Sequence, residues 1–100
     1  MREDRQRLDK WLWFARFAKS RTLAAKLVTD GFVRVNGLRA DSAAKAVAVG
    51  DVLTIAAPRT TSLIRVEALG IRRGPAPEAR LLYAEVARDD AALVTGPGKG

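Results

Sequence analysis

The sequence predicts an α+β fold, in which two short N-terminal helices pack on a small, mainly antiparallel sheet of four or five strands with a short C-terminal extension. Three observations indicate this class: apolar residues at helical spacing before residue 30, an alternating segment that leads into an Asn-Gly pair, and later apolar runs broken by glycine and proline. The chain of 100 residues allows one domain, which we expect to span 1–95, followed by a disordered tail at 96–100.

The first helix is expected from about Leu8 to Phe17. At about 100° per residue, two opposite sides of this helix are apolar. Such a helix is either covered on both sides or leaves aromatic side chains exposed. We favour packing beneath the C-terminal half of the chain, and keep base stacking or partner contact by exposed aromatics as the alternative. The two sides carry Leu8, Trp11, Leu12, Ala15 and Ala18 on one, and Trp13, Phe14 and Phe17 on the other.

Ser20 predicts the start of a second helix, because its hydroxyl can accept a hydrogen bond from an early backbone N–H. Gly31 is expected to end this helix in the left-handed conformation. The connection 18–20 is very short, so the two helices must cross tightly. The apolar stripe of this second helix consists of Leu23, Ala24, Leu27 and Val28.

The strands are expected after the second helix. Asn36-Gly37 is the strongest two-residue hairpin signal, and it joins alternating residues on either side. Gly50-Asp51 indicates another turn. A looser segment at 41–49 and a basic loop at 72–77 separate the remaining runs. The expected strands are 32–35, 38–40, 52–55, 63–69 and 81–86.

Positive charge is concentrated in the first half of the chain. The net charge is +7, and residues 1–50 carry eleven Lys and Arg against five Asp and Glu, whereas residues 51–100 carry seven against six. This asymmetry predicts a polyanion-binding surface on the N-terminal half. A solubilising charge excess is the alternative, although solvated faces usually mix both signs.

The composition argues against catalysis. The sequence has no cysteine and no histidine, which removes disulfides, thiolate zinc sites, cysteine nucleophiles and the usual general base. None of the three serines lies in a nucleophile elbow. No apolar run could span a membrane, and the charged N-terminus lacks a signal core. We therefore expect a cytoplasmic, monomeric protein that is not an enzyme and needs no cofactor or metal.

Several motifs together resemble the S4-type RNA-binding domain, named after a ribosomal protein of the small subunit. They are Arg7-Leu8-Asp9-Lys10, Arg16-x-x-Lys19-Ser20-Arg21, 31–37 and 49–53. This resemblance covers 7–56 and implies the S4-like αL motif, with extension strands within 62–86. Segments 10–21 and 72–83 are also similar to the heat-shock protein 15 family. That similarity implies binding to the large ribosomal subunit, including subunits that still carry a nascent chain on tRNA.

With this fold, the exit of the first helix, the entry of the second and the hairpin are expected side by side. Their cations would form a phosphate-binding cluster next to a helix N-terminus. Recognition should then follow the shape of structured RNA, since side chains read RNA duplex grooves poorly. The predicted RNA-binding residues are Arg7, Lys10, Arg16, Lys19, Ser20, Arg21, Lys26, Arg34, Asn36, Arg39 and Lys45.

Structural roles compete with these assignments. Asp9 is interpreted as a partner for a nearby arginine, and Asn36 as a turn residue first. Arg72 and Arg73 are interpreted as a solvated loop. At the level of function, a DNA-binding regulator is the main alternative, because two tightly joined helices superficially resemble a helix-turn-helix. An RNA-modifying enzyme ranks third, since no length remains for a catalytic domain.

Overall fold

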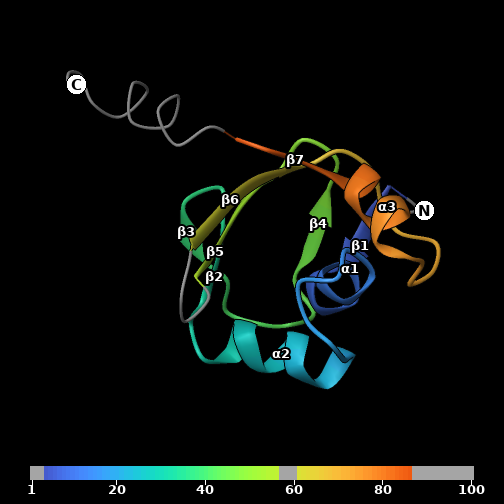
Figure 1. Cartoon of the computed structure of the whole chain (residues 1–100). Helices are drawn as coiled ribbons and strands as arrows, with labels where there is room; N and C mark the ends of the chain where they lie inside the picture. The colour runs from blue at the N-terminus through green and yellow to red at the C-terminus, as the bar shows by residue number, and fades with distance from the viewer. Residues whose placement is uncertain (1–3, 57–60, 87–100) are drawn as a thin grey trace, which may run out of the picture.

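A computed structural model describes residues 4–56 and 61–86, and it confirms the predicted α+β class (Figure 1). The expected tail at 96–100 lies outside the described residues. The elements in chain order are β1 (Arg5–Arg7), α1 (Leu8–Phe14), α2 (Arg21–Thr29), β2 (Val33–Val35), β3 (Leu38–Arg39), β4 (Ala46–Ala48), β5 (Val52–Ala56), β6 (Thr61–Val66), α3 (Ala76–Ala79), the 3-10 turn η1 (Arg80–Leu82) and β7 (Tyr83–Glu85).

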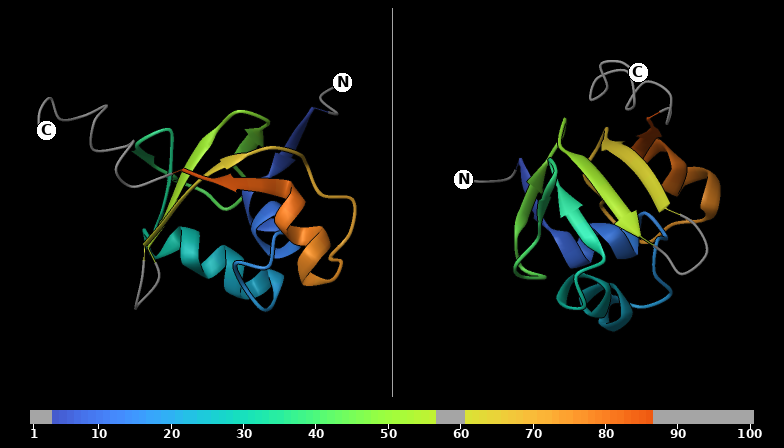
Figure 2. Two further views of the ribbon diagram at one scale, coloured as in Figure 1. Left: turned by 45° about the horizontal axis from the view of Figure 1, so that its top comes forward. Right: turned by 90° about the vertical axis from the view of Figure 1, so that its left-hand side faces the viewer.

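The main sheet has five strands in the order β3-β2-β5-β6-β7, and every neighbouring pair is antiparallel. The helices cover one face of this sheet, and the other face of β2, β5 and β6 is free of helices (Figure 2). Alternate residues of β2 and β5 point inward because side chains alternate along a strand. The inward side chains include Val33, Val35, Leu53 and Ile55, which are all buried.

A second, two-stranded sheet pairs β1 with β4, with Arg7 opposite Ala46. The sequence predicted neither strand. Each is only three residues long, and β4 lies in the segment that we expected to be loose. The pairing places the segment before α1 next to residues 45–48, which matters for the charged surface described below.

The second helix ends as expected. Ser20 caps its N-terminus by accepting a hydrogen bond from Leu23 N (3.1 Å). At its C-terminus Gly31 has φ 88°, and its N–H donates to Val28 O (3.0 Å). The following N–H, that of Phe32, donates to Leu27 O (3.0 Å). These two bonds form a Schellman motif, in which a left-handed residue closes the helix.

The first helix is shorter than predicted, because α1 ends at Phe14 and not at Phe17. Arg16 adopts the left-handed conformation (φ 67°), which turns the chain out of the helix. Its N–H donates to Trp13 O (3.1 Å), and the next N–H, that of Phe17, donates to Leu12 O (2.9 Å). This is again a Schellman motif, with arginine where glycine is usual. Nothing in the sequence at Arg16 indicates this end.

The C-terminal extension (residues 62–86) covers the second apolar side of α1, as favoured from the sequence. Phe14 is buried, while Trp13 and Phe17 are half-buried. The ring of Phe17 lies 4.8 Å from that of Tyr83 between centroids. Trp11 is fully buried and donates from Nε1 to Ala68 O (2.9 Å). The extension is therefore part of the same core as the N-terminal helices.

Candidate nucleic-acid interface

The turn between α1 and α2 exposes three cations, Arg16, Lys19 and Arg21. Arg16 donates from Nε to Gly74 O (2.7 Å), so its side chain lies against the extension. Lys19 has no carboxylate partner among the described residues. The hydroxyl of Ser20 accepts the capping hydrogen bond described above, which explains this residue by helix formation. The turn thus presents positive charge next to the N-terminus of α2.

Asp9 is a buried carboxylate that links two predicted RNA-binding residues. Arg7 donates to both of its oxygens at 3.1 Å, and Arg21 Nη2 lies 3.8 Å from Oδ1. The hydrogen bond and the Coulombic attraction of Asp9 raise the pKa of Arg7 above its ordinary value. The arginine side chains remain 51% and 43% exposed. One carboxylate therefore orients two cations and leaves a net positive charge at the surface.

Lys45 connects this group to the hairpin. Its carbonyl accepts a hydrogen bond from Leu8 N (2.8 Å), which places it next to Arg7 in the β1–β4 pair. On its other side, Lys45 lines a cavity of about 410 Å³ together with Arg39 and Asn36. The segment at 43–46 thus lies between the start of α1 and the hairpin, and the acid Asp41 lines the same cavity as Arg39 and Lys45. We call this surface the basic band, formed by Arg16, Lys19, Arg21, Arg7, Lys45, Arg39 and Arg34.

The hairpin contributes a pair of like charges. Arg34 and Arg39 are directly opposite each other on β2 and β3, and neither has a carboxylate partner in the described part of the chain. Like charges in this arrangement are destabilising by themselves. An anionic ligand would remove that penalty. Both residues also have contacts within the fold, since Arg34 Nη1 donates to Gly37 O (3.4 Å) and the guanidinium of Arg39 lies next to Gly31.

Asn36 has a sufficient structural explanation. It takes the left-handed conformation (φ 52°) that the two-residue turn requires. Its side chain joins the hairpin to β5, since Nδ2 donates to Asp51 Oδ1 (3.2 Å) and Oδ1 accepts from Val52 N (2.9 Å). The interpretation of Asn36 as a turn residue first therefore agrees with its contacts.

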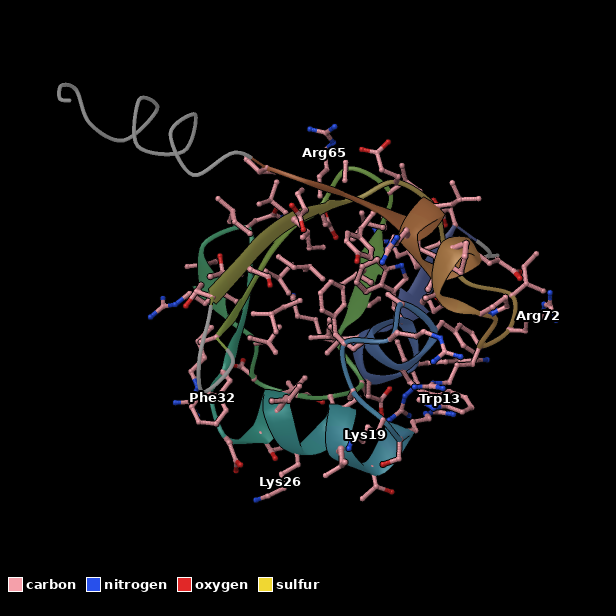
Figure 3. All side chains as sticks on the ribbon, viewed as in Figure 1. Trp13, Lys19, Lys26, Phe32, Arg65 and Arg72 are labelled. Atoms are coloured by element: carbon pink, nitrogen blue, oxygen red, sulfur yellow. The ribbon has the colours of Figure 1, made fainter. Side chains whose placement is uncertain are left out.

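Two predicted residues lie away from the basic band. Lys10 Nζ is 5.6 Å from the centre of the Phe14 ring, on the side of α1 that the extension covers. Lys26 is paired with Asp30 (3.1 Å) and points away from the sheet (Figure 3). The hairpin and the α1–α2 turn are also not side by side, because they lie at opposite ends of α2, about 13 Å apart for a helix of this length. The segment at 43–46 bridges that distance.

Sequence reasoning missed the role of Arg73. Its Nε donates to Trp13 O (3.2 Å) and its Nη2 donates to Ala18 O (3.3 Å). Arg73 thus contacts the α1–α2 turn across the fold, whereas neighbouring Arg72 forms an exposed pair with Glu78 and points outward (Figure 3). The two arginines are adjacent in a loop without periodicity, so no pattern could distinguish them.

Two further features were sought in the described residues, a metal site and a membrane-spanning helix. Within 4–56 and 61–86, no group of three or more Asp, Glu, His or Cys side chains could hold a metal ion. In the same ranges no helix combines the length and the apolar character that crossing a membrane requires.

Comparison with known proteins gives consistent results. The S4 domain model matches residues 6–53. A heat shock protein 15 homolog of Haemophilus influenzae is 44% identical over 85 residues, covering 85% of this chain and 64% of that protein. Heat shock protein 15 of Escherichia coli is 43% identical over 81 residues, covering 81% and 60% respectively. The chain therefore spans less than two thirds of the length of these relatives.

A solved structure is similar over nearly its whole length. It is described as a trimeric structure of Vibrio cholerae heat shock protein 15, with a TM-score of 0.79 and 40% sequence identity. The alignment covers 91% of this chain and 96% of that one. At this identity and coverage, both the fold and the sequence relate the two chains.

Proposed function

This chain belongs to the heat shock protein 15 family, and from that premise we propose that its S4 domain is a non-catalytic binder of structured RNA, specifically ribosomal RNA of the large subunit. The family resemblance extends the proposal to large subunits that still carry a nascent chain on tRNA, and to a cytoplasmic location. Every residue of the basic band comes from one chain, so the proposal needs no second copy, although the Vibrio cholerae relative is described as a trimer.

The observation that carries this proposal is the contiguity of cations without acidic partners. Lys19, Lys45, Arg39 and Arg34 lack carboxylate partners in the described part of the chain, and Arg7 and Arg21 share a single one. Cations on an ordinary solvated surface are interspersed with acids. A series of cations from three elements, with only Asp9 and Asp41 as acids next to it among the described residues, suits contact with a phosphate backbone.

The same arrangement favours recognition of shape over sequence. The guanidinium groups of the basic band suit bidentate contact with phosphate, while lysine contributes a compact charge. Five phosphate contacts would give a slope of about −3.5 to −4.5 when log K is plotted against log salt. Affinity should then fall by roughly two orders of magnitude between about 50 and 200 mM salt.

The test compares two double variants that remove the same charge. Arg39→Ala with Lys45→Ala removes two unpaired cations from the basic band, and Arg65→Ala with Arg72→Ala removes two cations that are paired with Glu67 and Glu78. Binding to large-subunit ribosomal RNA is measured as a function of salt. The first variant should reduce the magnitude of the slope by about 1.4–1.8, and the second should leave it nearly unchanged.

Duplex DNA of matched length serves as the competitor in the same assay. Preferential binding of the wild-type chain to this DNA would contradict the proposal and favour the DNA-binding alternative. Equal losses in the two double variants would show that only net charge matters. Circular dichroism of each variant establishes that the fold is retained, and sedimentation of cell extract through sucrose shows which ribosomal fraction contains the protein.

A further inference from the structure

The loop at 72–74 of the extension is bonded to the α1–α2 turn by three hydrogen bonds. Two are donated by Arg73, from Nε to Trp13 O and from Nη2 to Ala18 O. The third runs in the opposite direction, from Arg16 Nε to Gly74 O. Gly74 itself is buried. Each segment thus donates to carbonyl groups of the other, although they are more than fifty residues apart in sequence.

The turn depends on such contacts because residues 15–20 belong to no helix or strand. Trp13 O already accepts from Arg16 N, but Ala18 O lies in the turn outside any helix, where a backbone carbonyl needs a partner from elsewhere in the fold. The carbonyl of Ala18 lies directly before Lys19 and Ser20, the two residues that lead into α2. The bond from Arg73 to Ala18 O therefore fixes the backbone next to the exposed cations of the turn.

We propose that Arg73 is a positioning residue for RNA binding, which orders the α1–α2 turn so that Arg16, Lys19 and Arg21 present their charges in a fixed arrangement. This inference rests on the proposed function and adds to it a role for the extension, which lies outside the S4 domain match at 6–53. Ordering the cations before binding removes part of the entropy that a flexible turn would lose upon contact with phosphate.

The contacts distinguish this role from direct binding. Arg73 is half-buried, and two of its donor groups are engaged by carbonyls. Arg72 is exposed and pairs with Glu78 through two bonds, at 2.7 and 3.2 Å. The two residues have the same charge and neighbouring positions, so they form a matched pair in which only one contacts the turn.

The experiment measures the affinity of Arg73→Ala, Arg72→Ala and the wild-type chain for large-subunit ribosomal RNA across a series of salt concentrations. Arg73→Ala should bind roughly fivefold more weakly, which lies within the range by which residues outside a ligand contact modulate binding. The slope of log K against log salt should stay as in the wild type, because no phosphate contact is lost. Arg72→Ala should change neither quantity appreciably.

Hydrogen exchange provides a readout that does not depend on RNA. In Arg73→Ala the amides of Arg16 and Phe17, which donate to Trp13 O and Leu12 O, should exchange faster than in the wild type, while amides of β5 keep their protection. Arg73→Lys retains the charge and one donor, and should lie between the wild type and Arg73→Ala in both measurements. It also keeps the inference testable if Arg73→Ala fails to fold.

Three outcomes would overturn the inference. A slope reduced in magnitude by about 0.7–0.9 in Arg73→Ala would make Arg73 itself a phosphate ligand. Equal affinities of Arg73→Ala and Arg72→Ala would remove any role for the bonds to the turn. Unchanged exchange at Arg16 and Phe17 would show that the turn is ordered without the bonds from Arg73. If the wild-type chain binds no ribosomal RNA, the proposed function fails, while the exchange result still tests the ordering of the turn.

Discussion

The C-terminal ends of α1 and α2 share one backbone motif but differ in the residue that closes it. At α2 the left-handed position is occupied by Gly31, which adopts it without steric cost. At α1 it is occupied by Arg16, for which this conformation costs about 1 kcal/mol. The end of α1 is also covered by the extension, through Gly70 against Phe14 and Arg73 against the carbonyls, whereas Arg39 covers Gly31 at the end of α2.

Stability alone explains the residue at the end of α2, whereas the residue at the end of α1 has a further role. Glycine is the residue that stability alone would select at a left-handed position. An arginine there is strained, and strain of this type is found where a side chain has another role. Arg16 is exposed in the basic band and is bonded to Gly74 O, which agrees with such a role.

The largest effect is expected at the covered end of α1. In Gly70→Ala, the new Cβ would overlap Cδ2 of the Phe14 ring and would lie 2.7 Å from Cβ of Phe14. Phe14 is buried and cannot move away without disturbing the core, so we expect a loss of about 2–3 kcal/mol in the free energy of unfolding. Urea denaturation followed by tryptophan fluorescence measures this change.

Gly74→Ala is the matched control, because it lies in the same extension. There the new Cβ would meet the carboxylate of Glu78, which is the far end of a flexible side chain and can move aside. Its cost should stay below about 1 kcal/mol, the range of an exposed ion pair. Equal losses at Gly70 and Gly74 would mean that the extension does not pack on α1 as described.

The second prediction concerns substitutions at the left-handed position of each helix end. Arg16→Gly and Arg16→Ala both lose the bond to Gly74 O, but only alanine retains the left-handed strain. Arg16→Gly should therefore be more stable than Arg16→Ala by about 1 kcal/mol. At the other end, Gly31→Ala should be less stable than the wild type by a similar amount. Both differences are measured as midpoints of thermal or urea unfolding.

RNA binding separates the two ends further. Arg16→Gly and Arg16→Ala should bind ribosomal RNA equally weakly, since both lack the guanidinium. If Arg16→Gly were no more stable than Arg16→Ala, the left-handed backbone at this position would not be strained, and the comparison of the two ends would lose its basis.

Most of the fold was predictable because its signals are local. Ser20, Gly31, Asn36-Gly37 and Gly50 each indicate a cap or a turn through their own backbone preferences, and the structure places a cap or a turn at each of them. The β1–β4 pair was not predictable, since it joins short segments that are distant in sequence. The end of α1 was not predictable, because arginine is rarely left-handed and nothing else at position 16 indicates a turn.

The sequence indicated which types of residue form the candidate site, but not how they are arranged or paired. Charge asymmetry indicated the N-terminal half of the chain as the binding surface, yet it could not show which cations have acidic partners. Lys26 has one and Lys19 has none among the described residues. Nor could it distinguish Arg73, which contacts the turn, from Arg72, which does not. These distinctions require tertiary contacts that no periodicity encodes.

The smallest effect on stability is expected for Lys19, which lies just before α2, and for Lys26, which lies in its last turn. These two residues also provide a sharp test of the comparison between the helix ends. Lys26→Ala removes an exposed pair with Asp30, and Lys19→Ala removes an exposed cation without a partner, so each should change the free energy of unfolding by less than about 0.5 kcal/mol. RNA binding should differ between them. Lys19→Ala should reduce the magnitude of the salt slope by about 0.7–0.9, whereas Lys26→Ala should not. The reverse result would move the binding surface from the turn to the outer face of α2, where the end closed by glycine would be the functional one.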